Sequence, residues 1–278
     1  RQLGTEKFVI HTDLSEAQAR HYAAFFAGFY AYFATNYFQL VQPQKLNMLL
    51  FSKTVDYDAY HASGKPPSPF GYYQPARTTL VVNVERGLGT ATHELVHHFL
   101  TVGKMDHHPN WINEGIPMFF EKFMGYVADD GALHVSFGYF SNWRFPVAKE
   151  KIGSCTLSRL IEEGEPCLAS SFMLFLHKKG QLRHFVQQLQ AKGKDGKPVE
   201  ILVGVYGQPI GTIDREWKAW VASQPIDENV NLVPLAFIKT EAEWRAWWQE
   251  HQDRLIWNET QGLYLARPVK TGPKPSGN

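Results

Sequence analysis

The stretch TTLVVNVERGLGTATHELVHHFL, residues 78–100, combines the pattern of a strand with that of a helix. Its first part, TTLVVNV, is rich in β-branched and apolar residues, as a buried strand is. The glycines of GLGT interrupt this pattern, and Thr90 or Thr92 is available to cap a following helix. We therefore expect an α+β fold in which the strand leads directly into the helix. We also expect this strand to form a sheet edge along which an extended ligand lies.

The expected helix carries two histidines one turn apart. His93 and His97 are four residues apart, so both imidazoles can face a single ion. Glu94 lies beside the first histidine and can reach a water held by that ion. This HExxH arrangement supplies two zinc ligands and a general base, and zinc lowers the pKa of a bound water toward about 7. His98 points about 100 degrees round the helix and is expected to pack or to form a hydrogen bond instead.

A third metal ligand is needed, because a catalytic zinc ion normally has three protein ligands. In a chain with 12 histidines, chance alone gives an HExxH at a rate on the order of a few in a hundred, so the motif by itself is incomplete evidence. The segment WINEGIPMFFEKFM, residues 111–124, offers Glu114. We expect one helix here that begins near Asn113 or Glu114, since Pro117 fits only a first turn. The chain between the motifs is long enough to return antiparallel to the histidine helix. Glu121 would share the face of Glu114 and orient a histidine.

HELVH followed by WINEGIPMFFE resembles the gluzincin zinc metallopeptidases, whose second motif places the zinc-binding glutamate in a W-x-x-E-G context. The similarity is closest to the bacterial peptidase-MA-like group, a domain-of-unknown-function group in which a G-x-Y segment and a strand precede HExxH. GYY, residues 71–73, lies in that position. SSFMLFLHKKG and IDREWKAW also match later parts of the pattern. The resemblance covers roughly residues 7–222.

This resemblance implies a zinc-dependent endopeptidase acting on a peptide or protein substrate. His93, His97 and Glu114 would bind one zinc ion (Zn2+), and Glu94 would act as general base and then as proton donor. The implied fold is a thermolysin-like catalytic domain, with a small mixed sheet and the metal-site helix in one lobe and a mostly helical second lobe.

The same interpretation divides the chain into three parts. Residues 1–225 would form the catalytic domain, with lobes at about 1–110 and 111–225. Residues 226–265 would form a tryptophan-rich addition of a strand and a helix, and residues 266–278 a disordered tail. Three tryptophans at positions 244, 247 and 248 are expected to form one helix face, which docks on the main domain or, as the alternative, binds carbohydrate or protein.

Two departures from the family pattern bear on the chemistry. The G-x-M-E-N segment with which the aminopeptidase branch reads a free amine is missing, so aminopeptidase activity is not expected. The residue that often supplies a hydrogen bond to the oxyanion, a tyrosine before the serine-containing helix, is replaced by Cys167. The candidate substitutes are Tyr139, Tyr73, Tyr126 and His134. The alternative function is therefore an inactive, zinc-containing peptide- or protein-binding module, although the retained Glu94 favours an enzyme.

The amino-acid composition limits the classes of protein and of binding partner that are expected. Hydrophobic residues make up 44% of the chain and charged residues 20%, as in a globular protein. A net charge of +1 gives no reason to expect a nucleic-acid partner, and no apolar run reaches the roughly 18 residues of a membrane span. The oligomeric state is not indicated.

The two cysteines do not determine in which cellular compartment the protein is found. Cys155 and Cys167 would form one local disulfide in an oxidising compartment or stay as two buried thiols in a reducing one. The sequence starts at Arg1 without a methionine, as a processed or trimmed chain does, so the absence of a signal peptide says little about export. A secreted, periplasmic or cell-envelope location is expected ahead of a cytoplasmic one.

Overall fold

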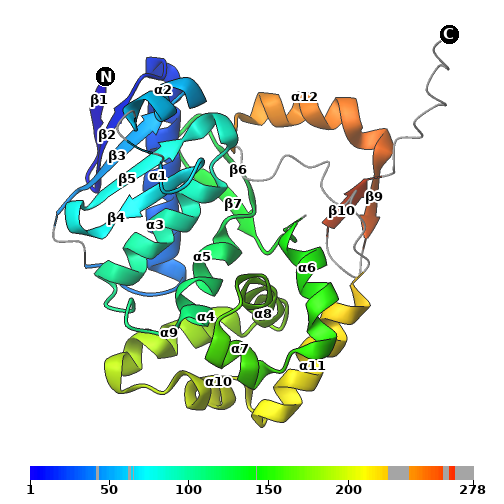
Figure 1. Ribbon diagram of the computed structural model, residues 1–278. Coiled ribbons are helices and arrows are strands. Elements are labelled where there is room, and N and C mark those ends of the chain that lie inside the picture. The colour runs from blue at the N-terminus through cyan, green and yellow to red at the C-terminus, as the bar shows by residue number, and fades with distance from the viewer. Residues whose placement is uncertain are drawn as a thin grey trace.

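The computed structural model combines α-helices with a small mixed sheet, which confirms the expected α+β class (Figure 1). It describes residues 1–41, 44–61, 64, 66–141, 143–224, 238–258 and 263–266. The strands are β1 (Gln2–Gly4), β2 (Phe8–Thr12), β3 (Leu46–Phe51), β4 (Gly71–Gln74), β5 (Thr79–Asn83), β6 (Phe123–Val127), β7 (Leu133–Phe137), β8 (Ile238–Lys239), β9 (Leu255–Asn258) and β10 (Leu263–Ala266). The α-helices are α1 (Glu16–Asn36), α2 (Thr54–Tyr60), α3 (Gly89–Val102), α4 (Asn110–Asn113), α5 (Gly115–Phe120), α6 (Arg144–Lys151), α7 (Leu157–Glu163), α8 (Pro166–Lys178), α9 (Leu182–Lys192), α10 (Pro198–Tyr206), α11 (Ile210–Ser223) and α12 (Glu241–His251).

The main sheet has the strand order β1-β2-β3-β5-β4. Its three inner strands, β2, β3 and β5, are parallel, and an antiparallel strand closes each edge. Parallel neighbours require crossover connections, which α1 and α2 supply. The inner strands are largely apolar because their neighbours and the covering helices remove them from water.

The strand that precedes the metal-site helix lies inside the sheet, so its prediction as the edge strand was wrong. β5 pairs with β3 on one side and with β4 on the other. The edge is β4, GYYQ, which no sequence pattern had predicted as a strand. Gly71 makes this pairing possible: its φ is +147°, and a Cβ there would lie 2.6 Å from the carbonyl oxygen of Val81.

Helix α1 is buried on more than one face because it lies between two β-structures. Ser15 and Gln18 form a capping box at its start. On the side of the main sheet, Tyr30 packs against Phe8, with ring centroids 6.1 Å apart. On the other side, Phe25 stacks on Phe123 of the β6–β7 hairpin, with centroids 5.2 Å apart. This explains an apolar pattern that covers more than one helical face.

The prediction of a single helix over residues 111–124 was wrong. The segment forms the short helices α4 and α5, which meet at Glu114, and then turns into strand β6. Residues 123–127 alternate between buried and partly exposed positions and pair with β7, as a hairpin strand does. Pairing of β6 with β7 thus ends the helix before Lys122.

Helices from the second half of the chain gather around α8 (Figure 1). Trp111 and Trp217 are both fully buried and contact Phe172 of α8 from distant parts of the sequence. The buried apolar residues form a continuous cluster from Phe8 to Val221, to which both predicted lobes contribute. The division at about residue 110 therefore stays a prediction.

The tryptophan-rich helix α12 contacts the β6–β7 hairpin. The indole N–H of Trp244 donates a hydrogen bond to the backbone oxygen of Gly125 at 3.0 Å, and β8 pairs with β6. Trp248 is 38% exposed, so the three tryptophans do not all share one buried face. Residues 225–237, 259–262 and 267–278, including most of the predicted tail, lie outside the described residues.

Cys155 and Cys167 are free thiols. The structure therefore contains the two unpaired thiols and not the local disulfide that was the other alternative. Cys155 is buried and Cys167 is partly buried. Among the helices that the structure describes, none combines the length and the apolar character needed to cross a membrane.

Candidate metal centre

Helix α3 is held firmly against α5 and strand β4. Leu95, Val96 and Phe99 are fully buried and anchor it in the core. The hydroxyl of Thr92 donates to the backbone oxygen of Phe120, at the end of α5, over 2.9 Å. A single side chain therefore ties the helix of the first motif to the helix that follows Glu114.

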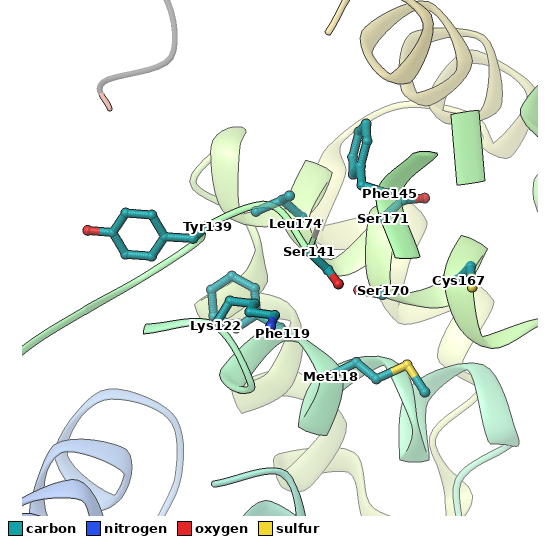
Figure 2. A pocket seen from close by; sticks show the side chains of 10 residues that line it. All are labelled: Met118, Phe119, Lys122, Tyr139, Ser141, Phe145, Cys167, Ser170, Ser171 and Leu174. Atoms are coloured by element: carbon teal, nitrogen blue, oxygen red, sulfur yellow. The ribbon is translucent and has the colours of Figure 1, made fainter. Parts of the chain in front are cut away.

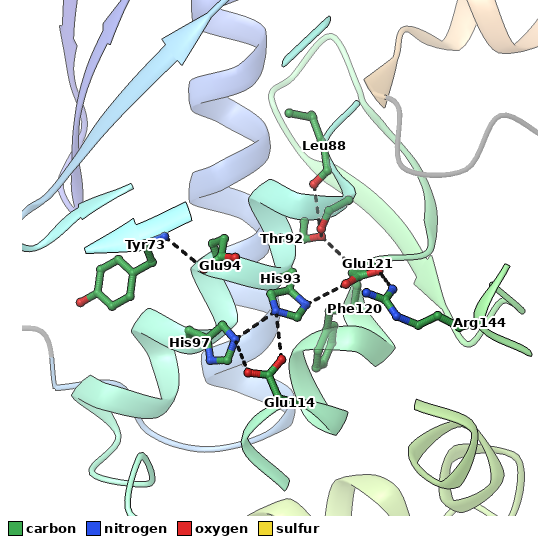
Figure 3. Close-up of polar contacts among 11 residues, drawn as sticks. Tyr73, Leu88, Thr92, His93, Glu94, His97, Glu114, Phe120, Glu121 and Arg144 are labelled. Carbon is green, nitrogen blue, oxygen red and sulfur yellow. Dashed lines mark hydrogen bonds and ion pairs between the residues drawn. The ribbon is translucent and has the colours of Figure 1, made fainter. Parts of the chain in front are cut away.

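The structure brings His93, His97 and Glu114 together (Figure 3). Their candidate ligand atoms all lie within 4.8 Å of one another. Nε2 of His93 is 3.0 Å from Nε2 of His97 and 3.6 Å from a carboxylate oxygen of Glu114, and Nε2 of His97 is 3.7 Å from the other oxygen. Ligands at about 2.1 Å from a tetrahedral ion are about 3.4 Å apart. The three side chains can therefore hold one metal ion without a large movement.

The two histidines differ in their affinity for protons. Burial lowers the pKa of His97 to about 3, so its imidazole is neutral and can donate a lone pair to a metal ion. Burial also acts to lower the pKa of His93, but the hydrogen bond with Glu121 and the nearby carboxylates outweigh it and raise the pKa above its usual value. Metal ions and protons therefore compete for the lone pair of His93, so metal binding at this site is expected to weaken as the pH falls.

Glu121 orients His93, as the sequence analysis expected. Nδ1 of His93 lies 2.8 Å from a carboxylate oxygen of Glu121, which leaves Nε2 facing His97 and Glu114. Burial tends to raise the pKa of Glu121, but His93 and the guanidinium of Arg144 hold it below the usual value. Glu121 is thus a buried carboxylate that fixes the ring and supports it as a ligand.

Arg144, which no sequence motif indicated, forms an ion pair with the second oxygen of Glu121. Arg144 is the first residue of α6, where a positive charge is unfavourable because the helix dipole is positive at its N-terminus. That placement was the available signal for a specific partner. The side chain connects α6 to the metal centre through Glu121 and His93.

Replacing Glu121 by Gln is expected to weaken metal binding by about 10- to 100-fold, the usual effect of losing such a partner. Gln keeps the size and one acceptor oxygen but removes the charge that supports His93. Competition against a chromophoric chelator measures the affinity. The control is Glu216→Gln, which removes a carboxylate that pairs with Lys179 on the surface, 2.8 Å away. Equal affinities in the wild type and both variants would show that Glu121 does not support the ligand.

Glu94 lies beside the three candidate ligands without being one of them. The backbone N–H of Tyr73, on edge strand β4, donates to Oε2 of Glu94 at 3.1 Å. Burial raises the pKa of Glu94 above its usual value, although His93 and this hydrogen bond oppose the effect. A carboxylate with a raised pKa and a fixed orientation can accept a proton and later return it.

The side chains proposed as oxyanion donors have other partners. The hydroxyl of Tyr73 lies 3.0 Å from Nδ1 of His98, which confirms that His98 forms a hydrogen bond instead of facing the metal centre. The hydroxyl of Tyr139 lies 2.7 Å from that of Ser136. Tyr126 stacks on His134 in the β6–β7 hairpin. An oxyanion role for any of the four candidates stays a prediction.

A scan of the chain against models of known protein families gives no match, and a search of curated proteins finds no relative. The function must therefore be argued from the geometry of the site.

Proposed function

We propose that this protein is a zinc-dependent metallohydrolase of the gluzincin type, with a thermolysin-like catalytic domain and endopeptidase activity. The observation that carries the proposal is the spacing of His93, His97 and Glu114, whose ligand atoms, one from each residue, all lie within 4.8 Å of one another. Two imidazoles and one carboxylate are a usual ligand set of catalytic zinc, and three protein ligands leave a further position open.

A bound zinc ion would act as a Lewis acid, which activates water and polarises a carbonyl group. The protein supplies the proton transfers. Glu94 accepts a proton from the attacking water, helped by its raised pKa, and passes it to the departing nitrogen. The Tyr73 backbone N–H holds this carboxylate in place. Glu121 and Arg144 fix the ring of His93.

A peptide substrate is favoured by the position of β4, which among the described strands pairs with β5 alone. In an antiparallel pair, successive residues alternate between facing the partner strand and facing away from it. The Tyr73 N–H binds Glu94, so Tyr73 faces away from β5, and its carbonyl oxygen does the same. An extended peptide can pair with this edge directly beside the general base. The missing G-x-M-E-N segment favours cleavage within a chain over removal of an N-terminal residue.

The alternative is a catalytically inactive, zinc-containing peptide- or protein-binding module. It is favoured by the partners of Tyr73 and Tyr139, whose hydroxyls lie next to His98 and Ser136. The position of Glu94 argues against an inactive module, because a structural zinc site requires ligands but no general base.

Peptide cleavage tests the proposal. The zinc-loaded protein, the chelator-treated protein and the re-zincated protein are incubated with a peptide library blocked by N-acetylation and C-amidation, and the products are identified by mass spectrometry. We expect internal cleavage that disappears with the metal and returns with zinc. Cleavage only of peptides with free amines would contradict the endopeptidase assignment. Zinc-dependent peptide binding without any cleavage would establish the binding module.

A further inference from the structure

Strand β4 has side chains on both faces of the main sheet. The Tyr73 side chain lies on the α3 side, where its hydroxyl is 3.0 Å from Nδ1 of His98. Side chains alternate along a strand, so Tyr72 lies on the opposite side. There its hydroxyl is 2.8 Å from Nε2 of His61, the residue that ends α2. The edge beside the general base therefore has a second face, which the metal centre does not use.

Aromatic rings form a connected group on this second face. Phe51 of β3 contacts Tyr57 and Tyr60 of α2, with ring centroids 5.8 and 5.3 Å apart. His61 in turn contacts Tyr60 at 4.9 Å and Tyr72 at 5.6 Å. We call these five residues the Tyr60 cluster. It connects α2 and β3 with edge strand β4.

Hydrogen bonds fix the inner part of the Tyr60 cluster. Tyr57 is fully buried, and its hydroxyl donates to the backbone oxygen of Ser68 at 2.6 Å. The ring of His61 is held at both nitrogens, with Nδ1 2.7 Å from the backbone oxygen of Tyr57 and Nε2 next to Tyr72. The hydroxyl of Tyr72 thus already has a partner. The apolar face of its ring is what Tyr72 can offer to a ligand.

The outer part of the Tyr60 cluster is in contact with water. Tyr60 is 51% exposed and Tyr72 is partly buried. Burial raises the pKa of Tyr72, and the neighbouring Tyr60 adds to the effect, as expected for two phenols that lie close together. Phe70, directly before β4, is 44% exposed. Covering this aromatic surface with an apolar group would be favourable.

A peptide paired with β4 would place one side chain against this surface. The backbone N–H of Tyr73 binds Glu94 and faces outward (Figure 3), whereas the backbone groups of Tyr72 face β5. For a strand added antiparallel at the outer edge, Tyr72 is therefore at a non-hydrogen-bonded position, where opposite side chains come closest. The two opposite residues have their side chains on the same face, with Cβ atoms about 5 Å apart. The adjacent peptide residue lies opposite Tyr73, beside the general base.

We propose that the Tyr60 cluster binds an aromatic side chain of the peptide substrate, next to the residue that lies at the general base. This inference rests on the proposed function and adds to it the substrate class. An aromatic side chain is favoured over an aliphatic one because ring pairs attract each other beyond the effect of the area that they bury.

A small pocket between α5 and α8 does not provide an alternative site for this side chain (Figure 2). It has room for about one water molecule. Among its described lining residues, none comes from β4 or α2. The Tyr60 cluster, in contrast, includes the residue next to Tyr73 on the same strand.

Peptide binding to the zinc-loaded Glu94→Gln protein tests this inference without the need for turnover. Three fluorescein-labelled, C-amidated peptides consist of Ala and Gln residues and differ at one central position, which is Phe, Leu or Ala. Fluorescence anisotropy gives the Kd of each peptide. We expect the Phe peptide to bind about 10-fold more tightly than the Ala peptide, with the Leu peptide between them.

Variants of the Tyr60 cluster in the same background locate the preference. Tyr60→Ala is expected to lower the preference for Phe over Ala by about 3-fold or more, because the exposed ring of the pair is lost. Tyr72→Leu removes the ring on β4 itself and should have the same effect, so it serves as the second variant if Tyr60→Ala does not fold. The matched control is Trp248→Ala, which removes a 38% exposed aromatic ring of α12. It should keep the full preference.

The possible outcomes separate this inference from the proposed function. Equal affinity for the three peptides overturns the aromatic site and leaves peptide binding intact. Tightest binding of the Leu peptide overturns the aromatic preference. An unchanged preference for Phe in both Tyr60→Ala and Tyr72→Leu shows that the side chain binds elsewhere, and it overturns the inference as well. Failure of all three peptides to bind contradicts the peptide-binding function itself, and the inference with it.

Discussion

Replacement of Glu94 by Gln is expected to leave the metal content unchanged and to lower kcat/KM for peptide cleavage by about 100- to 10,000-fold, the range for loss of a general base. Gln keeps the shape of Glu94 but cannot accept a proton from water. The metal should remain because the three side chains with ligand atoms within 4.8 Å of one another are His93, His97 and Glu114. The side-chain carbonyl oxygen of the Glu94→Gln variant can still accept a hydrogen bond from the backbone N–H of Tyr73.

Two measurements on the same sample separate catalysis from metal binding. Elemental analysis by mass spectrometry gives the zinc content, and cleavage of a blocked peptide gives kcat/KM. The control is Glu162→Gln, an exposed carboxylate on α7. Parallel loss of zinc and activity in Glu94→Gln would make Glu94 a ligand, and unchanged activity would remove it from the mechanism.

The parts of the fold that follow from local patterns were predictable. α3 begins within the glycines of GLGT, where the sequence predicts a helix, since helical hydrogen bonds join residues that are close in sequence. The N-cap of α3 is Leu88 and no side chain caps the helix, so the prediction that Thr90 or Thr92 caps it was wrong. β4 and β6 were missed as strands, because β4 is only four residues long and β6 closely follows helix α5 in a segment whose apolar residues also suit a helix. Whether a strand lies at the edge of a sheet or inside it depends on how strands from different parts of the chain pair. The edge position predicted for β5 was therefore wrong.

The candidate site also contains residues that local patterns predict and a residue that they do not. His93 and His97 are one turn apart on a single helix, so their proximity follows from helical geometry. Glu114 required the second motif and the resemblance to known metallopeptidases. Arg144 was missed because it is 23 residues from Glu121 and reaches it only after the β6–β7 hairpin has returned the chain. No spacing rule predicts that return.

Removal of one ligand tests the metal centre directly. His97→Ala is expected to weaken zinc binding by well over about 100-fold, since loss of an outer partner alone costs about 10- to 100-fold. His97 is neutral and its Nε2 is directed toward His93 and Glu114, so the protein has no obvious substitute for it. Glu114→Ala should have a similar effect. The zinc content of both purified variants should fall from about one per chain to near zero.

The thermal response to zinc provides a second measurement that does not depend on activity. Zinc at about 100 times its Kd stabilises the protein that binds it by about 2.7 kcal/mol, which corresponds to a rise in Tm of about 5 to 10 °C for a domain of this size. The wild type should show this rise, whereas His97→Ala and Glu114→Ala should not. His107→Ala, an exposed histidine in the loop after α3, should respond like the wild type. If His97→Ala and Glu114→Ala kept both the zinc and the rise in Tm, the ion would have to bind elsewhere. The general-base role of Glu94 would then lose its basis, because Glu94 is placed beside His93, His97 and Glu114.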